Sequence, residues 1–311
     1  MSKILVTGGS GYIGSVLVPK LLSSNHHVHV VDNLMYGQST LASCIANSKF
    51  TFTRGDVRNK ELMKTLLKNA DIVIPLAAIV GAPACDRDPI AASSINRDAV
   101  LQMFDSIGGS QRIIMPTTNS AYGQGDEDNF CDETTKLNPL SLYARDKVIV
   151  EEALMSLPGA TSFRLATVFG ISPRMRLDLL VNNFVYKAST DGYLTLFEGH
   201  FKRNFIHLND VVQAFELGIK RPEQFAGEIF NVGLSNANIS KIDLCNEIAK
   251  FLPQFYFTEA PLGEDPDKRN YIVSNKKIES VGFNPVVSIQ DGIAELIKGL
   301  QLFRHPHYSN I

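Results

Sequence analysis

A glycine-rich segment near the N-terminus constrains the fold of this 311-residue chain more than any other feature. The segment Thr7-Gly8-Gly9-Ser10-Gly11-Tyr12-Ile13-Gly14 follows the apolar run Ile4–Val6 and opens a stretch of helical periodicity over 13–23. Glycine permits a tight turn and close backbone contacts, so a strand is expected to enter this turn and a helix to leave it. The pattern indicates the first strand and helix of a parallel α/β sheet.

The rest of the first half continues this alternation. Short runs rich in β-branched or aromatic residues stand at 28–31, 50–52, 72–74 and 112–115, and segments of helical period stand at 60–68, 95–107 and 143–155. Further strands are predicted at 162–168 and 228–232. The fold class is therefore α/β, with a Rossmann-type doubly wound parallel sheet over 1–170 and further sheet segments near 203–235. A smaller, interleaved domain is predicted over 171–202 and 236–311, where the pattern is less regular.

The glycine turn and a later aspartate together indicate a dinucleotide site. Asp32 follows Gly14 by 18 residues, at the end of the second predicted strand, where a carboxylate accepts hydrogen bonds from ribose hydroxyls. Asp32 would repel a 2′-phosphate, and residues 33–40 contain no Arg or Lys to hold one, so the prediction is NAD rather than NADP. The residues assigned to NAD from this pattern are Gly8, Gly11, Tyr12, Ile13, Gly14, Asp32, Asn33, Asp56, Val57, Leu76, Ala77 and Ala78.

Two of these assignments have an ordinary structural alternative. Asp56 follows the third predicted strand, where it can meet the adenine edge or simply belong to a turn. The small residues in 76–78 suit a close approach of backbone to cofactor, and they suit a packed core almost as well.

A tyrosine and a lysine supply the candidate chemistry. Tyr143 and Lys147 are four residues apart and therefore share one face of the predicted helix over 143–155. A free phenol has a pKa near 10, so a nearby positive charge is needed to stabilise the phenolate. Lys147 can provide that charge and bind the nicotinamide ribose. The turn after the fifth strand carries Thr117 and Thr118, either of which can hydrogen-bond a substrate oxygen.

These motifs, in this order and over nearly the whole chain, resemble the extended short-chain dehydrogenases/reductases of the nucleotide-sugar epimerase/dehydratase family. The resemblance adds Asn96, at a helix start, to the NAD-binding residues. In that family the catalytic Ser or Thr lies four residues before the Tyr of a Tyr-Gly pair, here Tyr122, which selects Thr118. The implied catalytic residues are Thr118, Tyr143 and Lys147, with Tyr143 taking the proton of a sugar hydroxyl, usually that on C4, while hydride passes to NAD.

The resemblance also implies which residues hold a nucleotide sugar. They are Asn119, Ser120, Arg174, Arg176, Asn182, Asn183, Arg203 and Arg269. The planar fork of arginine pairs with phosphate oxygens, although each arginine could instead be a solvated surface side chain. The family's 4,6-dehydratases carry an acidic residue two places after the catalytic Thr, where this chain has Ser120, so no dehydration is predicted.

Three segments refine the implied activity. Residues 116–123, 169–182 and 263–269 most resemble family members that oxidise a GDP-heptose at C4 in capsule polysaccharide biosynthesis. We therefore expect an NAD-dependent nucleotide-sugar 4-dehydrogenase, with a 4-epimerase using the same three residues as the alternative. A non-enzymatic NAD sensor would not need Tyr143 and Lys147. The family further implies a homodimer formed through the helices that begin near Asn96 and Tyr143.

Composition excludes several other classes. The formal net charge of −2, without runs of like charge, argues against nucleic acid or anionic lipid as a partner. The four cysteines have no spacing typical of a zinc site, so no metal is predicted, and a reducing, cytoplasmic setting is expected. The longest apolar stretch, 70–84, contains Asp71 and Pro75 and is too short for a membrane helix of roughly 20 residues.

Overall fold

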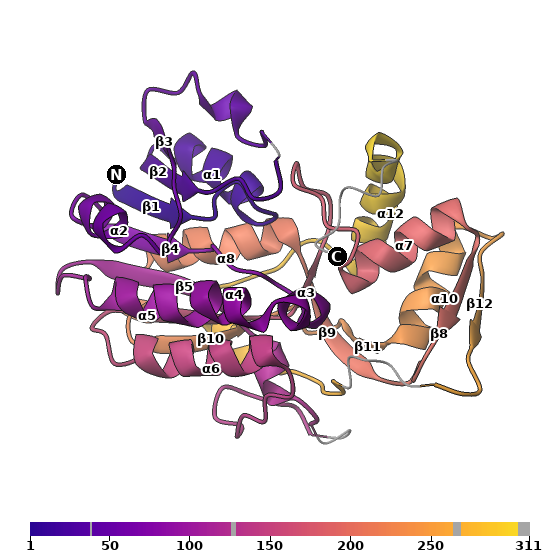
Figure 1. The fold of residues 1–311 in the computed structure, drawn as a ribbon. Coiled ribbons are helices and arrows are strands. Elements are labelled where there is room, and N and C mark those ends of the chain that lie inside the picture. The colour runs from indigo at the N-terminus through magenta and orange to yellow at the C-terminus, as the bar shows by residue number, and fades with distance from the viewer. Residues whose placement is uncertain (38, 126–128, 264–268, 304–311) are drawn as a thin grey trace.

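A seven-stranded parallel sheet forms the centre of the computed structural model, which describes residues 1–37, 39–125, 129–263 and 269–303 (Figure 1). Its strand order is β10-β6-β5-β4-β1-β2-β3, and every neighbouring pair is parallel. The strands are β1 (Lys3–Thr7), β2 (His27–Asp32), β3 (Phe50–Arg54), β4 (Ile72–Pro75), β5 (Arg112–Thr118), β6 (Thr161–Leu165) and β10 (Glu228–Val232). The predicted Rossmann-type α/β fold is confirmed.

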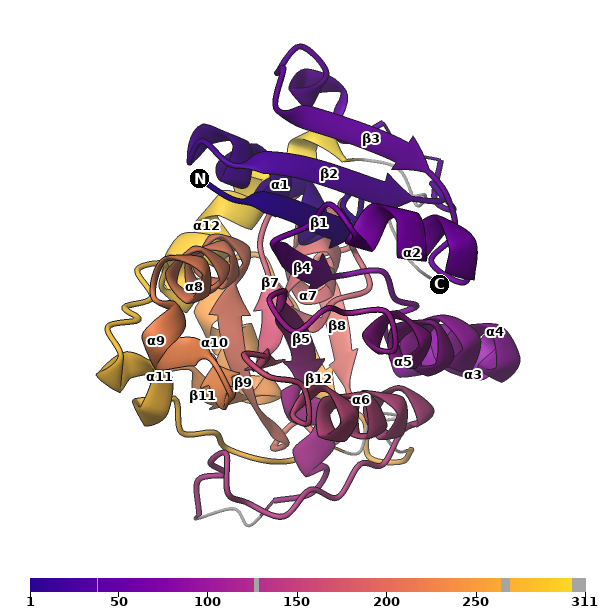
Figure 2. The same cartoon turned by 90° about the vertical axis from the view of Figure 1, so that its left-hand side faces the viewer.

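Helices cover both faces of this sheet, as the turned view in Figure 2 shows. On one face lie α1 (Gly14–Ser23) and α8 (Leu208–Lys220), which bury Leu17, Leu21 and Phe215 against the strands. On the other lie α2 (Lys60–Leu67), α5 (Ala99–Phe104) and α6 (Leu142–Leu154). Both faces of a parallel sheet are buried in this arrangement, which explains why its strands read as nearly continuous apolar runs. The short helices α9 (Pro222–Phe225) and α11 (Lys276–Ser280) pack beside β10.

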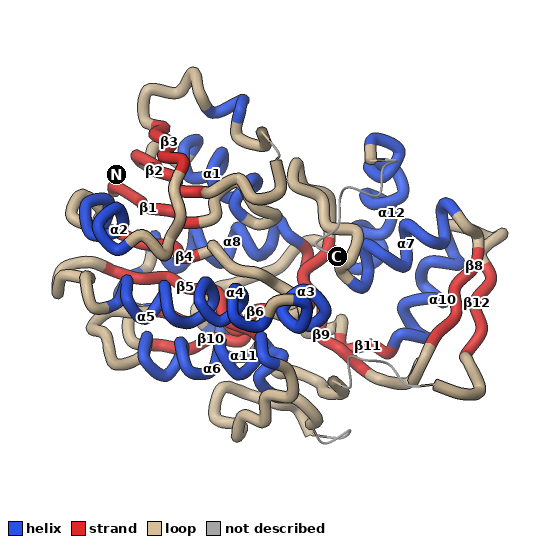
Figure 3. Tube along the Cα trace, viewed as in Figure 1, coloured by secondary structure: helices blue, strands red, loops and turns tan. Residues whose placement is uncertain are grey.

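A second, smaller region packs beside the carboxyl ends of the central strands (Figure 3). It contains a three-stranded sheet of β7 (Thr167–Phe169), β9 (Lys202–His207) and β11 (Asn238–Ser240), and a strand pair of β8 (Tyr193–Leu196) and β12 (Tyr256–Glu259). Its helices are α7 (Leu180–Thr190), α10 (Lys241–Phe251) and α12 (Ile289–Gly299). Capping boxes begin α10 at Ser240 and α12 at Ser288, since each serine pairs with an aspartate three residues later.

The structure differs from the predicted elements in three places. The strand expected over 162–168 is two strands, because β6 pairs with β5 whereas β7 turns away to pair with β9. The helix expected over 95–107 begins earlier, as α3 (Ala82–Arg87), α4 (Pro89–Ser93) and a π-helical turn at Ser94–Asp98 that leads into α5. Ile278 and Phe283, from the range predicted for the second domain, pack in the core of the main sheet.

None of the helices in the described part of the chain is long and apolar enough to cross a bilayer.

Candidate active site

A cavity of about 1000 Å³ opens at the carboxyl ends of the central strands. It runs along the turns after β1 and β4, the neighbouring strands at which the strand order reverses. Open parallel sheets bind ligands at this switch point, because the turns diverge there and leave a crevice. The second region closes the cavity with the segment after β7 and with side chains from β9 and α10.

The glycine turn lines one end of the cavity and could not be built from larger residues. Gly8 has a φ of +67°, and a Cβ there would lie 2.6 Å from the backbone of Ala77. A Cβ on Gly14 would lie 2.5 Å from the carbonyl oxygen of Gly9. The amides of Ser15 and Val16 donate to the backbone carbonyls of Gly11 and Ile13, so within the described chain it is the amides of Ile13 and Gly14 that remain available to an anion at the start of α1.

Asp32 lies at the end of β2, in the wall of the same cavity. Its carboxylate accepts hydrogen bonds from the backbone amides of Ser10 at 2.9 Å and Leu34 at 2.8 Å. These contacts fix the carboxylate beside the glycine turn, which is the place required for the ribose hydroxyls of a bound dinucleotide. Tyr12 and Asn33 also lie in the cavity lining or its entrance, as predicted for cofactor residues.

The remaining cofactor candidates divide into two groups. Asp56, Val57 and residues 76–78 line the cavity, and the Asp56 pKa is lowered by hydrogen bonds from Arg58. Asn96, in contrast, is fully buried outside the lining. Its side-chain amide binds both the amide and the carbonyl of Ile79, each at 2.8 Å. In the structure, Asn96, which was predicted as a cofactor residue, holds the loop that forms the cavity wall.

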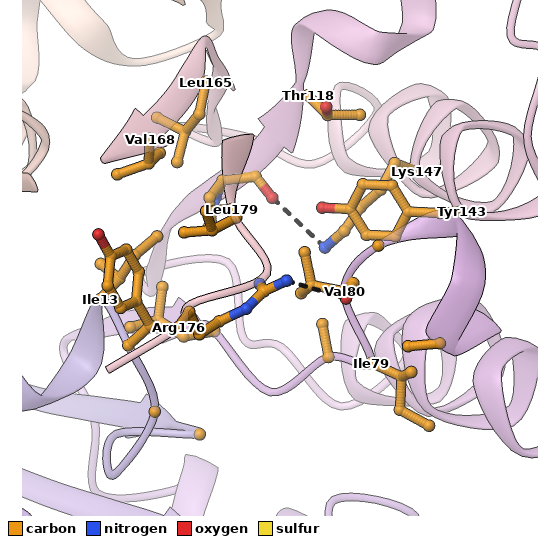
Figure 4. Close-up of a pocket in the computed structure, with 18 of the residues that line it drawn as sticks. Ile13, Ile79, Val80, Thr118, Tyr143, Lys147, Leu165, Val168, Arg176 and Leu179 are labelled. Atoms are coloured by element: carbon orange, nitrogen blue, oxygen red, sulfur yellow. Dashed lines mark hydrogen bonds between the residues drawn. The ribbon is translucent and has the colours of Figure 1, made fainter. Parts of the chain in front are cut away.

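Tyr143 and Lys147 extend from α6 into the cavity, side by side (Figure 4). Ser141 caps the helix, since its hydroxyl accepts from the Ala144 amide at 3.2 Å, and the predicted catalytic pair occupies the first two turns. The Lys147 ammonium lies 6.0 Å from the centre of the Tyr143 ring and donates to the Pro116 carbonyl at 3.4 Å.

Burial opposes ionisation of both side chains. It raises the pKa of Tyr143 to about 12, with a further contribution from Cys85 and an opposite one from Arg176 and Arg269. It lowers the pKa of Lys147 to about 8, against the influence of Cys85 and Asp146. A phenolate at Tyr143 therefore requires positive charge in the cavity.

The two threonines that end β5 have different environments. Both belong to the cavity lining, but the Thr117 hydroxyl is engaged in the protein interior, where it donates to Glu151 at 2.7 Å. Thr118 lines the cavity on the same side as Tyr143 and Lys147 (Figure 4). Its hydroxyl donates to the Ser120 hydroxyl at 2.9 Å and accepts from the Ser120 amide at 3.0 Å. This geometry favours Thr118, the residue chosen from the sequence, over Thr117.

Six further basic residues line the cavity: Arg145, Arg174, Arg176, Arg203, Lys241 and Arg269. Arg174 lies over the ring of Tyr36 at 4.1 Å, and Arg176 pairs with Asp178 and donates to the Val80 carbonyl. Arg269 donates to the Ser120 hydroxyl, so two of the predicted substrate residues meet beside Thr118. A concentration of guanidinium groups in a concave site suits a diphosphate.

Three predicted substrate residues lie outside the cavity lining. Asn182 is buried, accepts from the Gly170 amide at 3.0 Å and donates to the Arg176 carbonyl at 2.9 Å. Asn183 donates to the Leu177 carbonyl at 2.9 Å. These two asparagines shape the segment that carries the arginines instead of reaching a ligand. Asn119 is also buried, and its amide has no partner among the described residues.

The sequence analysis missed several lining residues. Tyr36 lies in the loop after β2, Lys241 begins α10, and Gln124 and Tyr271 lie near Arg269. Each comes from a segment without a local motif, so only the tertiary fold brings it to the cavity.

Comparison with known proteins identifies the family. The model of the NAD dependent epimerase/dehydratase family matches residues 4–233, well over half of the chain. The chain belongs to this family. It is therefore an enzyme with NAD as its cofactor, which confirms both predictions, and the NAD sensor is not retained.

Individual relatives match over nearly their whole length. A putative UDP-glucose 4-epimerase of Methanocaldococcus jannaschii is 26% identical over 313 residues, covering 96% of this chain and 98% of the relative. Protein CapI of Staphylococcus aureus is 25% identical over 331 residues, covering 95% and 97%. The crystal structure of a Bacillus cereus UDP-glucuronic acid 4-epimerase with UDP-glucuronic acid and NAD has a TM-score of 0.86 at 25% identity, covering 97% and 99%.

The residues present fit NAD. The close backbone contacts at Gly8 and Gly14, the available amides at the start of α1 and the oriented carboxylate of Asp32 match the turn, the pyrophosphate and the ribose of a dinucleotide. The residues that would hold NAD are those of the glycine turn, Asp32 and Asn33, with Lys147 at the catalytic end.

Proposed function

We propose that this enzyme oxidises the C4 hydroxyl of a nucleotide sugar to the 4-keto sugar. The observation that carries the proposal is the convergence of Thr118, Tyr143 and Lys147 on one wall of a cavity that also holds a dinucleotide turn and several arginines. Tyr143 takes the hydroxyl proton, Thr118 hydrogen-bonds the same oxygen, and Lys147 stabilises the phenolate. NAD, when bound, accepts the hydride from C4.

The first substrate to test is a GDP-heptose. The segments 116–123, 169–182 and 263–269 resemble those of GDP-D-glycero-α-D-manno-heptose 4-dehydrogenase, an enzyme of capsule-sugar synthesis. Within 263–269, residues 264–268 lie outside the described residues. The proposed diphosphate ligands are Arg203 and Arg269, with Arg174 and Arg176 toward the phosphates or the sugar; all four line the cavity.

A nucleotide-sugar 4-epimerase is the second candidate, and the relatives favour it. The Methanocaldococcus protein and the Bacillus cereus structure are both named 4-epimerases, and both names refer to UDP sugars. The two activities share the oxidation at C4 and differ in whether the ketone is reduced again on its other face.

Dehydration is not part of the proposal. Loss of the C6 hydroxyl needs an acid, since hydroxide is a poor leaving group. The two positions after Thr118 hold Asn119, which lies outside the cavity lining, and Ser120, which has no carboxyl group.

Mass spectrometry, combined with determination of the sugar configuration, separates these reactions. The enzyme with NAD is incubated in turn with GDP-D-glycero-α-D-manno-heptose, UDP-glucose and UDP-glucuronic acid, and absorbance reports any reduced cofactor. Loss of two hydrogens with accumulated NADH supports the dehydrogenase, whereas an isobaric product with a new sugar configuration supports the epimerase. Water loss as the main outcome would overturn the interpretation of Asn119 and Ser120. Failure of all three sugars to react would overturn the proposed substrate class.

The proposed assembly is a homodimer. Ile149, an exposed apolar side chain that is 42% accessible, lies on α6, one of the two helices that the family resemblance assigns to the contact, and Ile90, 85% accessible, lies on α4 just before the segment of Asn96. A sedimentation profile of twice the chain mass at micromolar concentration is expected, and a strictly monomeric profile would contradict it.

A further inference from the structure

A buried carboxylate sits between the two catalytic residues of α6. Asp146 immediately precedes Lys147, and its side chain is only 2% exposed. It accepts a hydrogen bond from the Ser93 hydroxyl at 2.8 Å and forms an ion pair with Arg97 at 3.4 Å. Ser93 ends α4 and Arg97 lies in the π-helical turn Ser94–Asp98, so both partners come from one neighbouring segment. A buried charge is stable only when it is paired, and this one has two partners.

The segment that holds Asp146 also shapes the cavity. Its Asn96 binds both backbone groups of Ile79, and Ile79 lines the cavity. The hydrogen bond between Ser93 and Asp146 therefore connects the helix that carries Tyr143 to the wall that faces it.

The direction of the carboxylate matters for Lys147. Consecutive residues of an α-helix point about 100° apart, so Asp146 faces the π-helical turn while Lys147 faces the cavity. The carboxylate thus acts on the ammonium by charge and leaves its donors available for ligands. The other ionisable groups around this pair are Arg97 from the π-helical turn and the Cys85 thiol from α3. Burial lowers the Lys147 pKa to about 8, and Cys85 and Asp146 raise it.

We propose that Asp146 is a positioning residue that fastens α6 to the α4 and π-helical segment and supplies the negative charge that keeps the buried Lys147 ammonium protonated. A neutral lysine could not stabilise the Tyr143 phenolate, so the alkaline limit of the activity depends on this carboxylate. The inference rests on the role proposed for Lys147 and concerns a residue that touches neither sugar nor cofactor.

Titration of Lys147 itself tests the inference without any nucleotide sugar. Protein carrying ¹³C-labelled lysine is saturated with NAD, and its lysine resonances are followed by NMR against pH, with the Lys147 signal assigned by its loss in Lys147→Met. Asp146→Asn keeps the side-chain shape and removes the charge. Its Lys147 midpoint is expected at least about half a pH unit below that of the unmutated protein, because the ammonium loses the stabilising effect of a neighbouring negative charge.

Two matched variants distinguish the electrostatic effect of Asp146 on Lys147 from its role in attaching α6 to the neighbouring segment. Ser93→Ala removes the shorter hydrogen bond but keeps the carboxylate, so it should lower the melting temperature and leave the midpoint in place. Arg97→Gln removes the facing positive charge at a partly exposed site and should raise the midpoint. An unchanged midpoint in Asp146→Asn, or an equal shift in Ser93→Ala, would overturn the inference. If Asp146→Asn does not fold, an unchanged or lower midpoint in Arg97→Gln overturns it.

Once a substrate is known, the alkaline limb of the kcat/KM profile should move by the same amount in Asp146→Asn. Failure of every candidate sugar would refute the proposed substrate class and would leave the NMR result standing.

Discussion

Replacement of Glu151 by glutamine is expected to reduce stability and turnover together. Glu151 lies two turns after Tyr143 on α6, and its carboxylate is the centre of a buried network. It pairs with Arg164 of β6, and it accepts hydrogen bonds from the Thr117 hydroxyl at 2.7 Å and the Ser162 hydroxyl at 2.6 Å. The side chains of the ion pair are each only 5% exposed.

The expected loss of stability follows from the groups that lose their partner in Glu151→Gln. Glutamine retains the shape, and the two hydroxyls can reorient to accept from its amide, but the Arg164 guanidinium stays buried without a counter-ion. Breaking a buried pair in this way costs about 3–5 kcal/mol. Protein domains are stable by about 5–15 kcal/mol, so the variant should fold with a clearly lower unfolding midpoint in urea. Because Thr117 adjoins Thr118, the catalytic turn should also shift, and a displacement near 1 Å can cost roughly a hundredfold in kcat.

Glu152→Gln is the matched control, since it makes the same chemical change at the next, exposed residue of α6. Its free energy of unfolding should lie within about 0.5 kcal/mol of the parent value. Adding Arg164→Met to Glu151→Gln should recover part of the lost stability by removing the unpaired charge. A cost below about 1 kcal/mol for Glu151→Gln, or no recovery in the double variant, would refute the reasoning.

Three further changes test the site. Tyr143→Phe removes the proton acceptor but no glycine-turn contact, so turnover should fall about 100- to 10,000-fold while calorimetric NAD affinity is nearly unchanged; near-normal turnover would remove Tyr143 from the catalytic residues. Asp32→Ala should narrow the preference for NAD over NADP in paired titrations, and equal affinities in the unmutated protein would contradict the role of Asp32. Lys147→Met should stabilise the cofactor-free fold at pH 7 by up to roughly 3 kcal/mol while abolishing turnover, because burial lowers the Lys147 pKa from 10.5 to about 8. The Lys147 ammonium is more stable in the unfolded chain than in the folded one, so the parent protein should gain stability as the pH rises from 8 to 10.5. The variant should lose that pH dependence. Denaturant titrations that show a less stable variant with the same pH dependence as the parent would refute this account.

The parts of the site that sequence could predict are those with local causes. The glycine turn needs a positive φ at Gly8 and backbone contact at Gly14, and both requirements appear directly as residue types. The spacing of Tyr143 and Lys147 places them on one helix face whatever surrounds the helix. The same reasoning found the strands of the central sheet, because strands buried on both faces must be apolar.

What the sequence could not predict depends on tertiary contacts. Tyr36 and Lys241 reach the cavity only because the loop after β2 and the start of α10 meet there. Asn182 and Asn183 were assigned to a phosphate by resemblance, yet their amides bind the backbone of 170–177, since an amide serves either role equally well. The division of 162–168 into two strands follows from pairing with β9, almost 40 residues later.

The architecture separates what is common to the family from what distinguishes its members. The dinucleotide turn, Thr118 and the Tyr143 helix are held by the central sheet, and the family match over 4–233 covers all of them. Of the cavity arginines, Arg174 and Arg176 stand on a segment held by Asn182, Arg203 stands on strand β9, and Arg269 comes from beyond the family match. Segments outside the sheet can change without disturbing its core, and a fold can keep one chemistry while its substrate changes. A TM-score of 0.86 at only 25% identity fits this division, because the backbone fold is shared while the side chains that line the cavity can differ between members.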